Sequence, residues 1–151
     1  MTNEQITTEC AKLIELGDEL LAITPTQNPI DIATQLGITI RFIKTKRETP
    51  GFVLKGDTIQ SSTIYINDEL DNYSKKIICA HELGHLYSDK LFDNDFSLFD
   101  ESIDSESEFF ANFMVYCLMR RVFVFAALDK YKTIHEFNSY VASRIHYRSN
   151  Q

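Results

Sequence analysis

The chain has 151 residues, which is enough for one domain with a substantial hydrophobic core. Its formal net charge is −7, with 15 Lys and Arg against 22 Asp and Glu, and this balance argues against a surface built mainly for nucleic acid. The three cysteines are widely spaced and form no CxxC pair. We therefore expect reduced thiols in a cytoplasmic protein, and the N-terminus has no pattern of a signal peptide.

The first part of the chain, residues 3–37, is predicted to form two helices. Apolar residues recur with helical spacing over 3–22, and the sequence TPTQNP then interrupts the pattern. In the second helix Asn28 is expected as the N-cap, Pro29 as the first helical residue, and Gly37 as the residue just past the end.

Residues 38–67 are predicted to form a small antiparallel three-stranded sheet. ITIRFIK alternates as a half-buried strand does, and GFVLKGDTIQSSTIYIN contains two more strands joined by a turn at Gly56 and Asp57. A sheet of this size is marginal on its own, so we expect it to pack on the helix predicted over 72–89. The expected fold class is therefore α+β, a small sheet packed on a helical core within a single domain, 1–151.

An acidic loop is predicted over 90–104, followed by an apolar helix over 105–127. The apolar stretch 109–128 is long enough to span a bilayer, but it contains Arg120 and Arg121. Because arginines at the centre of a membrane span are costly, we expect a buried helix and no membrane association.

The last helix is predicted over 133–147, with a capping box in TIHE at Thr133. Its apolar stripe consists of Phe137, Val141 and Ile145. We expect this helix to dock on the core. The alternative is a remnant of a helix-turn-helix that contacts DNA or a protein partner.

The most informative stretch is ICAHELGHLYSDK, which holds two of the four histidines. His81 and His85 are four positions apart, so they project from one face of a helix and can point two imidazole nitrogens at one ion such as Zn²⁺. Glu82 lies about 100° around the helix, beside the metal, where the HExxH motif has its general base. The alternative, two surface histidines with local hydrogen bonds, is disfavoured because the apolar neighbours indicate a buried helix, where unpartnered imidazoles cost free energy.

A catalytic zinc site usually has a third protein ligand. The two histidines elsewhere lack the spacing of HExxHxxGxxH, and Cys79 is on the wrong side of its helix. We therefore expect a carboxylate near the start of the next helix, and the candidates are Asp104, Glu106 and Glu108. Glu108 is favoured because Asn112 lies one turn later, where it can hydrogen-bond the outer nitrogen of a ligating histidine. Glu106 better fits an acid that interacts with the helix dipole.

A hairpin ending in IYIND is followed by HELGH and then by E-x-x-A-N, which opens an apolar helix ending in LM. With the lead-in PIDIATQLGITIRF, these features resemble the ImmA/IrrE-type zinc metallopeptidases over residues 25–120. The resemblance implies a thermolysin-like, gluzincin-type core. It also implies zinc held by His81, His85 and Glu108, with Glu82 as the catalytic base.

Members of that family are typically intracellular proteins of bacteria, phages and mobile elements, and several are thought to cleave a helix-turn-helix repressor encoded nearby. The resemblance therefore implies a cytoplasmic endopeptidase whose protein substrate is a DNA-binding repressor. Direct binding to nucleic acid is not expected. The chain departs from the family where Arg120 and Arg121 replace the usual proline after LM.

Peptide hydrolysis also requires a donor that stabilises the oxyanion. The sequence does not choose among Tyr87, Tyr116, Tyr131 and His135. The segment 89–108 contains eight acidic residues and one lysine, so it could attract basic segments of a repressor, or it could be a solvated charged loop.

Two other functions use the same motif. One is a regulatory module that keeps the zinc site and holds a repressor partner without cleaving it. Glu82 favours the enzyme, because a structural zinc site is usually closed by four protein ligands and needs no base. The other is a different HExxH hydrolase such as a deformylase, which takes a cysteine ligand from an upstream Gly-Cys segment that this chain lacks.

Overall fold

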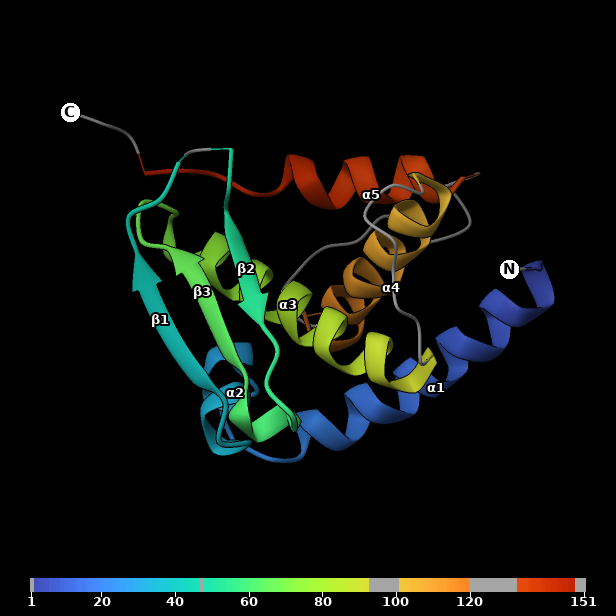
Figure 1. Ribbon diagram of the computed structural model, residues 1–151, viewed down its shortest axis with the longest axis horizontal. Helices are drawn as coiled ribbons and strands as arrows, with labels where there is room; N and C mark the ends of the chain where they lie inside the picture. The colour runs from blue at the N-terminus through green and yellow to red at the C-terminus, as the bar shows by residue number, and fades with distance from the viewer. Residues whose placement is uncertain (1, 47, 93–100, 120–132, 149–151) are drawn as a thin grey trace.

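The computed structural model describes residues 2–46, 48–92, 101–119 and 133–148. This part of the chain is α+β, with five helices and one three-stranded sheet. The long helix α3 (Asn72–Phe92) lies between the sheet and α4 (Glu101–Met119). Figure 1 shows the strands on one side of α3 and α4 on the other.

The two N-terminal helices begin where the sequence predicted, and the first ends one residue before the predicted 22. α1 (Asn3–Leu21) starts with a capping box between Thr2 and Gln5 and packs on α4. α2 (Pro29–Gln35) starts at the N-cap Asn28, whose side chain accepts a hydrogen bond from the N–H of Ile30. Gly37 follows with φ 85°, a left-handed conformation that glycine adopts without strain.

The sheet is mixed, which corrects the prediction of an antiparallel sheet. Its strands are β1 (Thr39–Ile43), β2 (Gly51–Leu54) and β3 (Thr63–Asn67), in the order β1-β3-β2. β2 and β3 pair antiparallel, but β1 and β3 pair parallel. The prediction assumed that strands adjacent in sequence are also neighbours in the sheet. β3 takes the central place instead, where Ile64 and Ile66 are fully buried.

The connection between β2 and β3 is longer than the predicted turn at Gly56 and Asp57. It contains a 3-10 helix, η1 (Ile59–Ser61), capped at its start by Thr58. Gly56 donates its N–H to the hydroxyl oxygen of Ser62, which holds the connection against the start of β3.

The remaining helices differ from the prediction at their ends. α3 extends to Phe92 and α4 begins at Glu101, so every residue of the predicted loop 90–104 that the structure describes is helical. α4 is described to Met119, and the predicted continuation to 127 lies outside the described residues, as do Arg120 and Arg121.

α5 (Ile134–Ser143) is shorter than the predicted helix 133–147. The backbone of the last residues pairs with the loop between β3 and α3 instead of continuing the helix. Tyr147 forms a β-bridge with Leu70, and the N–H of Arg148 donates to the carbonyl oxygen of Glu69 at 2.8 Å. Phe137 and Val141 are buried, so α5 docks on the core.

Helices α3 and α4 approach each other closely at Gly84. A Cβ added there would lie 2.6 Å from the Cα of Ala111, closer than packed carbon atoms come. α4 is buried along this contact, where Phe110 and Met114 are 1% and 0% exposed.

None of the described helices is long and apolar enough to cross a membrane.

Replacing Gly84 by alanine tests this contact. At an exposed helical site the change would stabilise by about 0.5–1 kcal/mol, because alanine loses less conformational freedom than glycine. Here we expect a loss of about 1–3 kcal/mol, typical of an overpacked core, because α4 must move away. Urea unfolding of the metal-free protein measures the change, and an increase in stability would contradict the packing described here.

Candidate metal centre

Two histidines on α3 point toward one place. His81 and His85 are one helical turn apart, with side chains 14% and 16% exposed. Their Nε2 atoms lie 3.1 Å from each other. Because the two rings meet at Nε2, the same nitrogen of each imidazole is available to a shared ion.

Glu108 on α4 completes the group. Its Oε2 lies 3.2 Å from Nε2 of His81, and its Oε1 lies 2.9 Å from Nε2 of His85. One atom from each of the three side chains lies within 4.8 Å of the other two. Two imidazole nitrogens and a carboxylate oxygen are a donor set that fits Zn²⁺ and leaves a fourth position open. The chemistry of these side chains therefore fits a metal ion.

The charges in this group favour an ionised carboxylate. Burial alone would raise the pKa of Glu108, but hydrogen bonds from His81 and His85 and the charges of these imidazoles hold that pKa well below its usual value. Burial lowers the pKa of His81, but Glu108, Glu82 and Asn112 outweigh it and raise that pKa. Glu108 is therefore a carboxylate at neutral pH, the state that a metal ligand needs.

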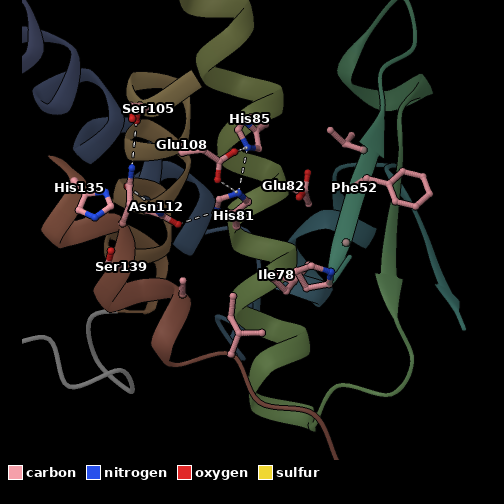
Figure 2. A pocket seen from close by; sticks show the side chains of 16 residues that line it. Phe52, Ile78, His81, Glu82, His85, Ser105, Glu108, Asn112, His135 and Ser139 are labelled. Carbon is pink, nitrogen blue, oxygen red and sulfur yellow. Dashed lines mark hydrogen bonds and ion pairs between the residues drawn. The ribbon is translucent and has the colours of Figure 1, made fainter. Parts of the chain in front are cut away.

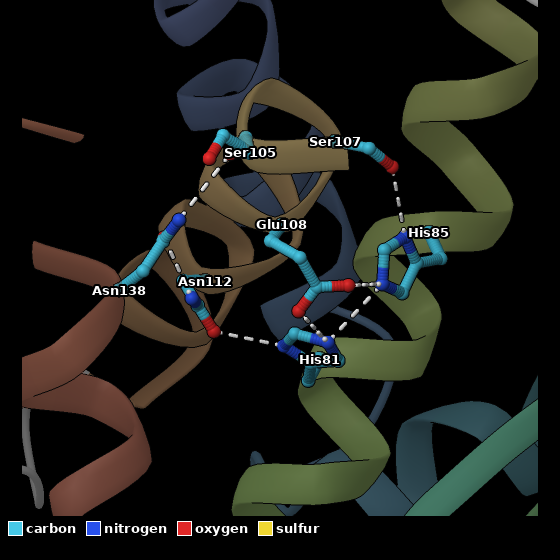
Figure 3. Close-up of polar contacts among 7 residues, drawn as sticks. All are labelled: His81, His85, Ser105, Ser107, Glu108, Asn112 and Asn138. Atoms are coloured by element: carbon cyan, nitrogen blue, oxygen red, sulfur yellow. Dashed lines mark hydrogen bonds and ion pairs between the residues drawn. The ribbon is translucent and has the colours of Figure 1, made fainter. Parts of the chain in front are cut away.

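The outer nitrogens of both imidazoles also have partners (Figure 3). Nδ1 of His81 lies 2.8 Å from Oδ1 of Asn112, the contact that the sequence predicted. Nδ1 of His85 lies 3.3 Å from the hydroxyl oxygen of Ser107. Such bonds orient the rings of metal ligands. Ser107 was missed, because a serine beside a glutamate at the start of a helix has no distinctive pattern.

Glu82 lies next to the group but outside it. Its side chain is on the side of the histidines that faces β2 (Figure 2), and the residue is 6% exposed. Burial raises the pKa of Glu82, as does the charge of Glu108, while the charges of the two imidazoles and of Lys55 oppose the rise. A carboxylate with a raised pKa is a better proton acceptor.

The group opens into a cleft of about 870 Å³. One wall is β2 and the other is α5, with α3 and α4 at the base. Apolar residues line it on both sides, namely Phe52 and Val53 of β2, Ala142 of α5, and Ile145 just after α5. Because the strand order places β2 at an edge of the sheet, a strand edge borders the cleft.

Other residues predicted for the site fall elsewhere. Glu106 is not part of the three-residue group, and the side chain of Asp104 lies outside the described residues. Cys79 is buried, donates its thiol to the carbonyl oxygen of Pro29 at 3.5 Å, and has a raised pKa because of burial.

The four predicted oxyanion donors are also separated by the structure. His135 lines the cleft, whereas Tyr87 and Tyr116 are not among the residues that line it. Tyr131 lies outside the described residues.

Comparison with known proteins gives one family. The family model described as the IrrE N-terminal-like domain, of the Peptidase M78 group, matches residues 33–146. The match covers well over half of the chain and includes the three-residue group and the cleft. No curated protein and no solved structure gives a significant match.

Replacing Glu108 by glutamine removes the charge that faces both imidazoles. Because a neutral amide is a poor zinc ligand, we expect Zn²⁺ affinity to fall by more than the roughly 10–100-fold typical of losing an outer hydrogen bond. Competition with a chromogenic chelator measures the affinity. Glu106→Gln is the matched control and should bind Zn²⁺ as the wild type does, and the reverse result would make Glu106 the ligand.

Proposed function

The chain belongs to the IrrE N-terminal-like peptidase family, and we propose that it is a zinc-dependent endopeptidase of the cytoplasm. The observation that carries the proposal is the meeting of His81, His85 and Glu108, with Glu82 beside them, in one cleft. His81, His85 and Glu108 would hold the zinc ion. When bound, zinc polarises a peptide carbonyl and lowers the pKa of water toward about 7.

Glu82 has the role of general base. Its buried carboxylate accepts a proton from the attacking water and then donates that proton to the leaving nitrogen of the peptide bond. The raised pKa of Glu82 supports this role, because the group must both take up and release a proton near neutral pH.

The edge strand supports a peptide as the substrate. β2 pairs with β3 on one side only among the described strands, so its other edge has backbone groups free to pair with an extended peptide. A peptide bound along this edge would pass in front of Glu82 and the metal group, which lie between β2 and α4 (Figure 2).

His135 is the favoured oxyanion donor among the four predicted residues. It lies on α5 and faces the cleft, and an imidazole N–H can donate to a developing oxyanion. A catalytic hydrogen bond of this kind often reaches its full strength only when substrate binds.

A DNA-binding repressor is the proposed substrate. The acidic segment 89–108 includes the end of α3, the start of α4 and the residues between them, and its net negative charge would attract basic segments of such a protein. The intact base Glu82 supports cleavage rather than the alternative, a zinc-containing module that holds the repressor without cutting it.

Glu82→Gln separates cleavage from metal binding. We expect this variant to keep Zn²⁺ and to lose proteolysis, because the amide cannot accept the proton from water. The measurement compares new protein N-termini in host cells that express the wild type or the variant. A repressor fragment present only with the wild type would identify the substrate.

Glu15→Gln is the matched control, because it makes the same chemical change on the exposed face of α1. It should give the wild-type pattern of new N-termini. If Glu82→Gln also gave that pattern, the proposed mechanism would be wrong, and identical patterns with and without the protein would favour the non-cleaving module.

A further inference from the structure

A chain of three hydrogen bonds runs from α4 through α5 to the metal group (Figure 3). The backbone carbonyl of Ser105 accepts from Nδ2 of Asn138 at 3.2 Å. Oδ1 of Asn138 accepts from Nδ2 of Asn112 at 2.8 Å. Oδ1 of Asn112 then lies 2.8 Å from Nδ1 of His81. Asn138 itself does not contact the metal group, so any effect it has must pass through Asn112.

The backbone carbonyl of Ser105 determines the direction of the whole chain. A carbonyl oxygen can only accept, so the amide of Asn138 must present its NH₂ group there and its oxygen to Asn112. Asn112 must in turn donate with its nitrogen and present its oxygen to His81. Nδ1 of His81 therefore donates in this contact and keeps its proton, so the proton that must leave when the imidazole binds a metal ion is the one on Nε2, the nitrogen that faces Glu108.

From this geometry we propose that Asn138 is a positioning residue for the metal ligand His81. It holds the amide of Asn112 in the one orientation that accepts from Nδ1 of His81 and so leaves Nε2 as the nitrogen that binds a metal ion. The inference rests on the metal site proposed above and adds a residue of α5 to it.

The opposite orientation of Asn112 explains why a positioning residue matters. Its NH₂ group would then face Nδ1 of His81, and two N–H groups cannot bond to each other. The imidazole would have to move its proton to Nε2, the nitrogen that faces Glu108 and His85. A proton on Nε2 excludes a metal ion from that position. Asn112 is 5% exposed, so little water is available to replace the missing partner.

The test is a double-mutant cycle on Zn²⁺ affinity. Asn138→Leu removes the acceptor for Asn112 at similar volume, and we expect Zn²⁺ affinity to fall about tenfold, the lower end for lost outer contacts. Asn112→Asp replaces the amide by a carboxylate. Either of its oxygens can accept from Nδ1 of His81, so the side chain no longer has to be held in one orientation. In that background we expect Asn138→Leu to leave the affinity unchanged.

Two further variants serve as a control and as a substitute. Ser143→Ala, on the exposed face of α5, removes a hydroxyl that bonds only within the helix and should leave Zn²⁺ affinity unchanged. Asn138→Ala removes the same acceptor without a bulky side chain, and it replaces Asn138→Leu in the cycle if thermal unfolding shows that the leucine variant does not fold.

Each result has a defined meaning. The proposal is supported if Asn138→Leu lowers Zn²⁺ affinity when Asn112 is present and leaves it unchanged in the Asn112→Asp variant. Equal losses in both backgrounds would overturn it, because Asn138 would then act only by docking α5. If the wild type binds Zn²⁺ and Asn138→Leu does not change the affinity, the role of Asn138 is overturned and the metal site stands. A wild-type protein that binds no Zn²⁺ would overturn both the metal site and the role of Asn138.

Discussion

The close approach of α3 and α4 at Gly84 is the contact on which the site depends. Gly84 lies between His81 and His85, and Ala111, which it meets, lies between Glu108 and Asn112. A larger residue at this crossing would separate the two helices. Glu108 would then be carried away from the imidazoles that it now contacts at 3.2 and 2.9 Å.

Electrostatics and packing act together at this crossing. Glu108 is half-exposed, at 49%, yet both of its oxygens face imidazole nitrogens of α3. The carboxylate raises the pKa of His81, and the imidazoles lower the pKa of Glu108, so each side stabilises the charged form of the other. A metal ion would take the place of these mutual contacts, because it needs the same carboxylate and the same two nitrogens.

Local patterns in the sequence were enough to predict which side chains meet in the candidate site. Two spacings of four residues, His81 to His85 and Glu108 to Asn112, are properties of single helices. The structure brings both pairs together at the site. The sheet order was not predictable in this way. Which strand takes the centre of the sheet depends on which one buries its side chains most deeply, and in this fold that strand is β3.

The partners that join different elements were also beyond sequence reasoning. Ser107 contacts His85 because α4 packs against α3, and Asn138 contacts Asn112 because α5 packs against α4. The end of α5 at Ser143 was missed for the same reason: the backbone of the following residues pairs with the loop after β3, which no local pattern announces.

The central claim is that two imidazoles and one carboxylate bind a zinc ion. X-ray absorption at the zinc edge, on the purified protein loaded with one equivalent of Zn²⁺, tests it most directly. The account predicts two imidazole nitrogens at about 2.0–2.1 Å and carboxylate or water oxygen at about 2.0–2.2 Å. Sulfur scattering at about 2.3 Å, or only one imidazole in the fit, would contradict it.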